Sequence, residues 1–260
     1  MFIIWGRKIT RKRIGYVVDF CSICRSLQTF ELQAVHSSGH VYYISLGGGA
    51  LVGYERKCVD CGAAYKAETT TYASLEKRRL SFDELKRLTL PTVSAATQAR
   101  LDLEGRIRSG RSQLTPQQRY TLVREPFLIL SPKVERRFAN THIDAPTGLA
   151  MIGAVALTFA GGWVGEHVFP DSAGMVLLIA AGIGAALVVW QFVESGSRFM
   201  RREIIPALAK ALDPLQPTLD EIERVLAELQ QAKQKIGRKL KASRLLESLS
   251  SNGSRQLISN

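Results

Sequence analysis

The runs APTGLAMIGAVALTFAGGWVG (residues 145–165) and SAGMVLLIAAGIGAALVVWQFV (residues 172–193) decide the architecture of this 260-residue chain. Neither run contains Asp, Glu, Lys, Arg or His, and their lengths are 21 and 22 residues. A helix of about 20 apolar residues crosses the hydrocarbon core of a bilayer, which is roughly 30 Å thick. Each run therefore predicts a transmembrane helix. The alternative is a hairpin buried in a soluble core, but two uninterrupted apolar runs of this length are uncommon there.

The six residues that connect the runs, Glu166–Asp171, combine charge with a proline and predict a tight turn. The two helices would then form a hairpin. Six basic residues flank it on the other side: Lys133, Arg136, Arg137, Arg198, Arg201 and Arg202. The connecting turn has no Lys or Arg, so the positive-inside rule places both termini in the cytoplasm. We expect an integral membrane protein of the bacterial inner membrane.

The net charge of +12 is divided between the two flanks of this apolar region. Residues 148–197 contain no Lys or Arg and three acidic residues. This distribution argues against a uniformly basic soluble protein. At the start of the chain, the apolar run Met1–Trp5 is followed by a cluster of basic residues. In a signal peptide the basic residues come first and the apolar run is longer, so this segment is not predicted to be one. It is predicted to begin a β-strand.

All four cysteines of the chain lie in two CxxC pairs, Cys21/Cys24 and Cys58/Cys61. A gap of two residues lets both thiolates of a pair turn toward one ion, and two pairs complete the tetrahedral shell that a structural Zn²⁺ prefers. Gly62 follows the second pair, where a metal knuckle needs a residue that tolerates positive φ. The sequence therefore predicts a zinc site made by Cys21, Cys24, Cys58 and Cys61.

These cysteines have three alternative uses. A cytoplasmic compartment is reducing and disfavours disulfides. A redox CxxC would open a helix in a βαβ unit, whereas both pairs here follow segments typical of strands. An iron or iron–sulfur centre uses the same thiolate ligands and stays open as an alternative to zinc.

The 33 residues between the pairs must contain folded structure, because this spacing is longer than usual for a zinc site. Three segments are rich in β-forming residues: Thr29–Val35, Val41–Leu46 and Leu51–Lys57. Residues 37–40 and Gly47–Gly49 separate them and predict two turns. The expected unit is a small β zinc ribbon at residues 1–65.

These N-terminal residues resemble a known family. The run FIIWG, the basic stretch after it, CSIC, HVYYISLGGGALVGYERKC and CVDCG are similar to the bacterial zinc-ribbon family found at the N-termini of small, often membrane-bound proteins. The resemblance covers about residues 1–65 and implies a ribbon that holds Zn²⁺ through the four cysteines. It implies no catalytic residue and no substrate. Many such ribbons read CPxCG in the first knuckle, where this chain has CSICR.

The other two regions read as helical and cytoplasmic. In residues 66–144, capping signals predict helices over Ser81–Leu88, Ser94–Ser109 and Thr115–Leu130. In residues 195–260, a capping box at Thr218–Glu221 predicts an amphipathic helix to about Leu249, followed by a disordered tail. Ile222, Leu229 and Ile236 are seven residues apart, so this helix can form a short coiled coil. Its basic end, Lys233 to Arg244, can instead lie along anionic headgroups. Packing against the helices of residues 66–144 is an equal alternative.

Small residues inside the apolar region, residues 145–194, indicate close helix packing. Gly161 and Gly165 form a GxxxG pair, and the second run contains Ala180/Gly184 and Gly182/Ala186. We expect these residues to pack the hairpin against itself, with homodimerisation as the lesser alternative. No ionisable residue lies within either run to form an ion pathway.

For function, the sequence favours a non-enzymatic interaction or regulatory protein that binds another protein at the membrane's cytoplasmic face. No catalytic triad, carboxylate pair, phosphate loop or small-molecule site is evident. The alternative is a tethered nucleic-acid-binding ribbon, because basic residues and aromatics suit phosphates and bases. Its candidate residues are Arg7, Lys8, Arg11, Lys12, Arg13, Tyr42, Tyr43 and Tyr54.

Overall fold

The computed structural model describes residues 5–41, 44–110, 113–139 and 143–258. The chain forms two compact units. The ribbon unit comprises Met1–Leu130, Ala207–Val225 and Leu245–Asn260. The hairpin unit comprises Ser131–Pro206 and Leu226–Arg244. The predicted strand start at residues 1–4 lies outside the described residues.

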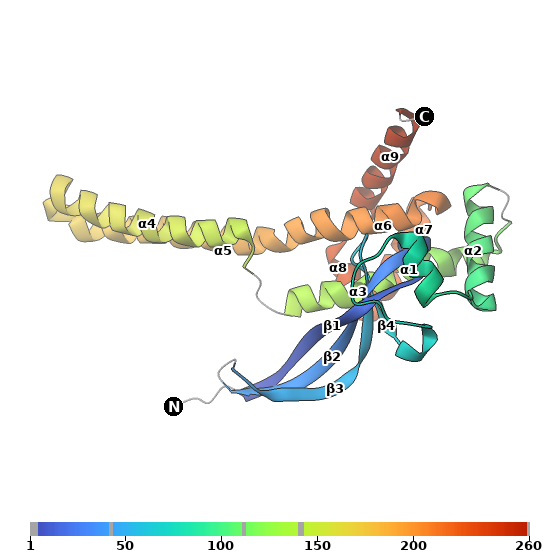
Figure 1. Cartoon of the computed structure of the whole chain (residues 1–260). Helices are drawn as coiled ribbons and strands as arrows, with labels where there is room; N and C mark the ends of the chain where they lie inside the picture. The colour runs from blue at the N-terminus through green and yellow to red at the C-terminus, as the bar shows by residue number, and fades with distance from the viewer. Residues whose placement is uncertain (1–4, 42–43, 111–112, 140–142, 259–260) are drawn as a thin grey trace. The chain divides into compact units, whose positions relative to one another are not determined.

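A four-stranded antiparallel sheet dominates the first part of the ribbon unit (Figure 1). Its strands follow in chain order: β1 (Trp5–Cys21), β2 (Ser26–Val41), β3 (Ile44–Cys58) and β4 (Ala64–Ala67). Side chains alternate between the two faces of a strand, so Phe30, Leu32 and Ala34 of β2 are all buried on one face. Val17 and Val18 of β1 have no exposed surface. The sheet is consistent with the small β unit that the sequence predicts at the N-terminus.

The two turns predicted between the cysteine pairs were wrong. Residues 37–40 lie inside β2 and Gly47–Gly49 inside β3, so two long strands replace three short ones. The register between β2 and β3 shifts on either side of Ser37. Gly49 has a φ of +71°, and a Cβ there would lie 3.0 Å from the Ser37 carbonyl oxygen. Turn-forming residues here accommodate an irregularity in the ladder, as at a β-bulge.

The three helices predicted after the ribbon are present: α1 (Phe82–Thr89), α2 (Ala95–Arg108) and α3 (Pro116–Ala139). Thr115 and Gln118 form the predicted capping box, since each side chain accepts a hydrogen bond from the other's backbone N–H. Helix α3 continues past its predicted end at Leu130, although Pro126 and Pro132 each remove one backbone donor. Phe127, next to the first proline, and Val134, two residues after the second, are both fully buried, and tertiary packing of this kind stabilises a helix.

The C-terminal region is divided into more helices than expected: α6 (Ile205–Leu212), α7 (Leu219–Gln231), α8 (Lys235–Lys239) and α9 (Ala242–Ile258). A continuous helix to Leu249 was a wrong prediction, because Lys233 adopts a φ of +59° and ends it. Gly237 allows α8 to fold back, as a Cβ there would lie 2.7 Å from the Leu226 carbonyl oxygen. Ile222, Leu229 and Ile236 are buried, but Ile236 lies on a separate helix. Helix α9 includes residues for which the sequence predicts disorder.

The two apolar runs form helices α4 (Ala145–Val168) and α5 (Ala173–Phe199), which lie side by side as a hairpin in Figure 1. Small residues bring their backbones together. A Cβ on Gly161 would lie 2.5 Å from the Ala180 Cβ, and one on Gly184 would lie 3.0 Å from the Ala154 Cβ. These glycines therefore pack the hairpin against itself, as predicted.

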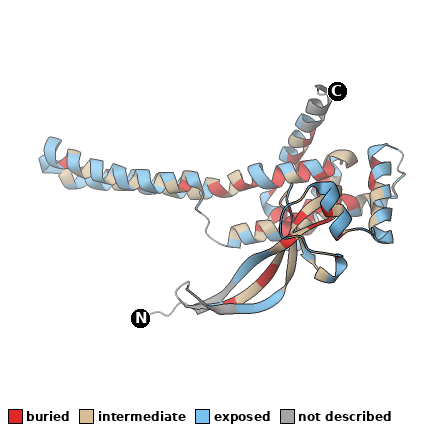
Figure 2. Cartoon of the chain, in the orientation of Figure 1, coloured by how far each residue is buried: buried red, intermediate tan, exposed pale blue. Residues whose placement is uncertain are grey.

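Both helices are long and apolar enough to cross a membrane. In the most apolar window of each, only 6% and 11% of residues are buried, as the pale blue of Figure 2 shows. Phe159 and Val193 are 77% and 75% exposed. A core helix of a soluble protein would instead be mostly buried.

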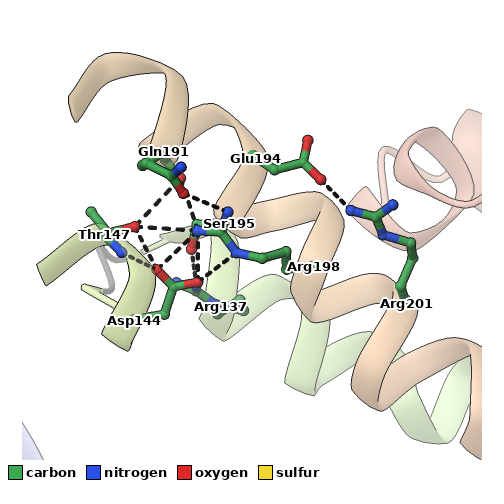
Figure 3. A network of polar contacts seen from close by, with 8 residues as sticks. All are labelled: Arg137, Asp144, Thr147, Gln191, Glu194, Ser195, Arg198 and Arg201. Carbon is green, nitrogen blue, oxygen red and sulfur yellow. Dashed lines mark hydrogen bonds and ion pairs between the residues drawn. The ribbon is translucent and has the colours of Figure 1, made fainter. Parts of the chain in front are cut away.

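A polar network closes the open end of the hairpin (Figure 3). Asp144 caps α4 by accepting hydrogen bonds from the Thr147 backbone N–H and from its hydroxyl. The Arg198 guanidinium of α5 binds the same carboxylate at 3.0 Å and also donates to the Gln191 side chain. Arg137 donates to the hydroxyl of the buried Ser195. The network therefore marks where the two apolar helices meet polar side chains.

Candidate metal centre

The sheet brings both cysteine pairs to one end. Cys21 is the last residue of β1 and Cys58 the last residue of β3. Cys24 and Cys61 lie in the connections to the following antiparallel strands. Because β1 and β3 run in the same direction, these two connections lie at the same end of the sheet. The topology therefore places all four predicted ligands together.

The four Sγ atoms lie within 4.8 Å of one another. The Cys21–Cys61 separation is 3.5 Å, and the Cys24–Cys58 separation is 4.0 Å. Sulfurs placed tetrahedrally about 2.3 Å from a Zn²⁺ ion are about 3.8 Å apart. All four cysteines are free, and these separations are too long for a disulfide, whose S–S bond is about 2.05 Å. The residues fit a closed four-thiolate metal site.

Each knuckle contains a residue with left-handed backbone. Gly62 has a φ of +71° and donates its N–H to the Cys58 carbonyl at 3.0 Å. The equivalent residue of the first knuckle is Arg25, with a φ of +55°. This conformation costs a non-glycine residue roughly 1 kcal/mol. Although CSICR lacks the glycine, its first knuckle has the same left-handed backbone as the second. Because arginine adopts this conformation at a cost in free energy, the arginine side chain is expected to have a role of its own.

Burial and crowding make the sulfurs unlike free thiols. Hydrogen bonding from Cys24 lowers the pKa of Cys21 well below its ordinary value, whereas hydrogen bonding with Cys21 raises the pKa of Cys24 and that of Cys61. Without a cation, some members of the cluster therefore stay protonated while others ionise. A divalent metal favours the fully ionised set, because it binds all four thiolates and offsets part of their mutual repulsion.

Two polar side chains contact the cluster directly. The Asp60 carboxylate lies 3.1 Å from the Cys24 sulfur and also accepts a hydrogen bond from Lys210 on α6, at 2.5 Å. The Lys210 hydrogen bond lowers the pKa of Asp60. The Tyr65 hydroxyl lies 3.4 Å from the Cys21 sulfur, and burial raises the pKa of that phenol. It can therefore donate a hydrogen bond to a thiolate.

The side chain of Arg25 is buried in the interior of the ribbon unit. It forms a 2.7 Å ion pair with Glu104 of α2 and donates to the Ala211 carbonyl of α6 at 2.5 Å. Arg108 in turn donates to the Arg25 carbonyl at 2.8 Å. The first knuckle therefore contacts two helices, α2 and α6. In the sequence, the arginine in place of the glycine of CxxCG is the one feature that indicates this role. No sequence feature near Lys210 predicts its contact with Asp60 of the second knuckle.

Two of the candidate nucleic-acid residues on β1, Arg11 and Arg13, contact neighbouring side chains. Arg11 forms a 2.8 Å ion pair with Glu55, and Arg13 lies over the Tyr16 ring and donates to its hydroxyl. Lys12 is exposed. Tyr42 and Tyr43 lie outside the described residues, as do the side chains of Arg7 and Lys8.

No protein-family model, curated protein or solved structure matches the chain.

Proposed function

We propose that this protein is a membrane-anchored zinc ribbon that acts as a non-enzymatic interaction or regulatory module at the cytoplasmic face. The cysteine cluster carries the proposal: four sulfurs within 4.8 Å of one another, in a chain that also has an exposed apolar hairpin. A closed four-thiolate shell leaves no position for substrate, so the metal stabilises the fold rather than performing chemistry.

Zinc is the proposed ion because its preferred tetrahedral geometry agrees with sulfur separations of 3.5 and 4.0 Å. A single iron is coordinated similarly, whereas an iron–sulfur cluster also needs inorganic sulfide. Metal analysis of the purified chain separates these ions. We expect one zinc per chain, and stoichiometric iron would contradict this assignment.

The membrane anchor is proposed from the exposed apolar side chains of α4 and α5. Phe159, Leu178 and Val193 are each more than 70% exposed, a costly arrangement in water. We expect the chain to pellet with membranes and to enter solution only with detergent. Recovery in the supernatant after ultracentrifugation without detergent would contradict the anchor.

A surface suited to a protein partner lies on the sheet, away from the cysteines. Ile9, Leu51 and Val52 are 47%, 51% and 65% exposed. Leu51 pairs with His36 and Gly53 with Val35, so Val52 is the extra residue of a β-bulge beside Leu51. Ile9 pairs with Ser37 and therefore lies on the opposite face from Leu51, so the proposed contact site consists of Leu51 and Val52 on β3.

The partner proposal is tested by crosslinking in intact cells, comparing the wild type with a Leu51→Asp/Val52→Asp variant. We expect a crosslinked adduct of defined mass that the variant loses while it keeps its zinc and its membrane location. A Lys77→Asp/Arg78→Asp variant, which changes exposed residues elsewhere in the same unit, provides the matched control. An adduct containing nucleic acid, sensitive to nuclease, would instead support the tethered nucleic-acid-binding alternative.

A further inference from the structure

The segment Lys233–Arg244 of the hairpin unit is strongly basic. It contains six basic residues and no acidic residue: Lys233, Lys235, Arg238, Lys239, Lys241 and Arg244. Its apolar members, Ile236, Leu240 and Ala242, are buried, whereas every basic residue except the half-buried Lys235 is exposed. The segment therefore has a fixed apolar side and a free cationic side.

The acidic residues at the open end of the hairpin already have partners. Glu203 pairs with Lys133, Glu194 with Arg201 and Asp144 with Arg198; Glu135 pairs with Lys235 at 4.0 Å. Within the described part of this unit, five cations of the segment form no ion pair: Lys233, Arg238, Lys239, Lys241 and Arg244. The positive charge of the segment thus remains available to an external anion.

Contacts to α3 fix the segment near the end of the hairpin. The Lys235 backbone N–H donates to the Glu135 carboxylate, and the Ser131 hydroxyl donates to Gln234. The Lys239 ammonium lies 5.4 Å from the centre of the Phe138 ring. That ring lies against α5 at Gly196, where a Cβ would be 2.7 Å from the Phe138 Cε1 atom.

This position corresponds to the level of lipid headgroups. Gly196 follows the end of the apolar run at Val193 by three residues, or about 4.5 Å along a helix. The headgroup layer on each side of the hydrocarbon core is roughly 5–7 Å thick. Lys239 therefore lies beside the layer in which lipid phosphates are found.

We propose that the cationic side of Lys233–Arg244 binds the phosphate groups of anionic lipids in the membrane that holds the hairpin. The inference rests on the proposed membrane anchor. The chemistry is charge complementarity at short range, strengthened where the bilayer surface is negative. The segment then adds a second attachment to the membrane and sets the orientation of α8 against it.

The test uses the full-length protein in lipid nanodiscs of pure phosphatidylcholine or of phosphatidylcholine mixed with phosphatidylglycerol. Amide hydrogen exchange in residues 233–244 is the readout. We expect exchange to slow by about fivefold to tenfold in the anionic discs. This is the size of effect expected when at least one Lys or Arg is held at an anionic membrane surface. Added salt should reduce the difference because it screens exposed charges.

Two variants identify the residues responsible. Arg238→Gln/Lys239→Gln/Lys241→Gln should abolish the difference between the two lipids, and Lys233→Gln/Arg244→Gln should reduce it. The control Lys77→Gln/Arg78→Gln/Arg79→Gln removes the same charge as the triple variant from exposed residues of the ribbon unit and should retain the full difference. All of these side chains are exposed, so folding and zinc content should be unchanged.

The outcomes separate this inference from the membrane anchor. Equal exchange in both kinds of nanodisc would overturn lipid binding while leaving the anchor intact, and failure to enter nanodiscs would overturn both. Slower exchange in phosphatidylcholine discs on addition of inorganic phosphate would show a general anion site. The same result with single-stranded RNA would show a nucleic-acid site, and either result would overturn the proposal.

Discussion

Arg25 and Glu104 form an ion pair of 2.7 Å between Nη1 and Oε2, and each side chain is only 2% exposed. Arg25 directly follows the candidate ligand Cys24, whereas Glu104 lies on α2, so the pair connects the candidate metal centre to a helix distant in sequence. Glu104 also binds Arg100 at 3.0 Å. A charge buried to this extent is costly unless it keeps its partner. The first knuckle and α2 should therefore depend on each other.

Replacing Arg25 with glycine should destabilise the protein even though glycine suits a φ of +55°. Loss of a buried ion-pair partner costs about 3–5 kcal/mol. Relief of the left-handed backbone returns roughly 1 kcal/mol, and Arg100 still partly compensates Glu104. We expect a net loss of about 2 kcal/mol in the free energy of unfolding, measured by denaturant titration in detergent.

The double variant Arg25→Gly/Glu104→Leu provides the control. It removes the uncompensated carboxylate, so most of the lost stability should return. Zinc content should remain that of the wild type in both variants, because glycine supports the knuckle. A double variant as unstable as the single one would show that the ion pair is not the source of the effect.

Removal of the metal should loosen α2 without affecting the apolar hairpin. The knuckle positions the Arg25 backbone, and a structural zinc supplies much of the folding energy of such a site. After chelation, hydrogen exchange should become faster in Ala95–Arg108 and stay unchanged in α4 and α5. Addition of zinc should restore protection. Equal exchange in α2 with and without metal would argue against this coupling.

The sequence predicted features that depend on residues close together in the chain better than features that depend on distant residues. CxxC spacing, helix caps and apolar runs are local signals, and they predicted the cluster of four cysteines, α1 to α3 and the two long apolar helices. The turns near Gly39 and Gly49 were misplaced because glycine serves equally in a turn and in an irregular strand. Arg25 and Lys210 could not be found, since their partners lie 79 and 150 residues away in the chain.

The break after α7 was missed for a similar reason. Heptad spacing from Ile222 to Ile236 suits one continuous helix, and the local pattern contains no proline to interrupt it. The chain turns back instead because Gly237 packs against the backbone of Leu226. Such a contact forms only in the folded chain, where tertiary packing overrides the helical periodicity.

Charge on Asp144 should stabilise the open end of the hairpin across the neutral and mildly acidic range. Burial alone would raise the pKa of Asp144, but hydrogen bonds from Thr147 and Arg198 outweigh it and lower the pKa to about 2. The unfolded-state pKa is near 3.9. Because the folded pKa is the lower one, the stabilisation is fully present above pH 4 or so and is lost as the pH falls toward 2.

The variant Asp144→Asn isolates this effect, because asparagine is also a good helix cap but carries no charge for Arg198. Its thermal midpoint in detergent should be below that of the wild type at pH 7. The difference between the two proteins should shrink between about pH 4 and pH 2. A difference that stays constant over this range would show that the carboxylate charge contributes nothing to the network.

Matched glycine substitutions should distinguish packing within the hairpin from homodimerisation. Gly161 lies against Ala180, whereas Gly182 has no atom within 4 Å of the position of an added Cβ. Leucine at either position gains the same helix propensity over glycine. Gly161→Leu should therefore lower the thermal midpoint in detergent because the helices must separate, whereas Gly182→Leu should not lower it.

The second variant also tests the dimer. If Gly182 and Ala186 mediate close contact with another copy, leucine at position 182 should reduce dimer crosslinking in membranes while the monomer keeps its stability. If crosslinking is the same in Gly182→Leu and the wild type, these small residues serve neither contact. Destabilisation by both substitutions to the same extent would contradict the packing described for α4 and α5, because only one of the two glycines touches the facing helix.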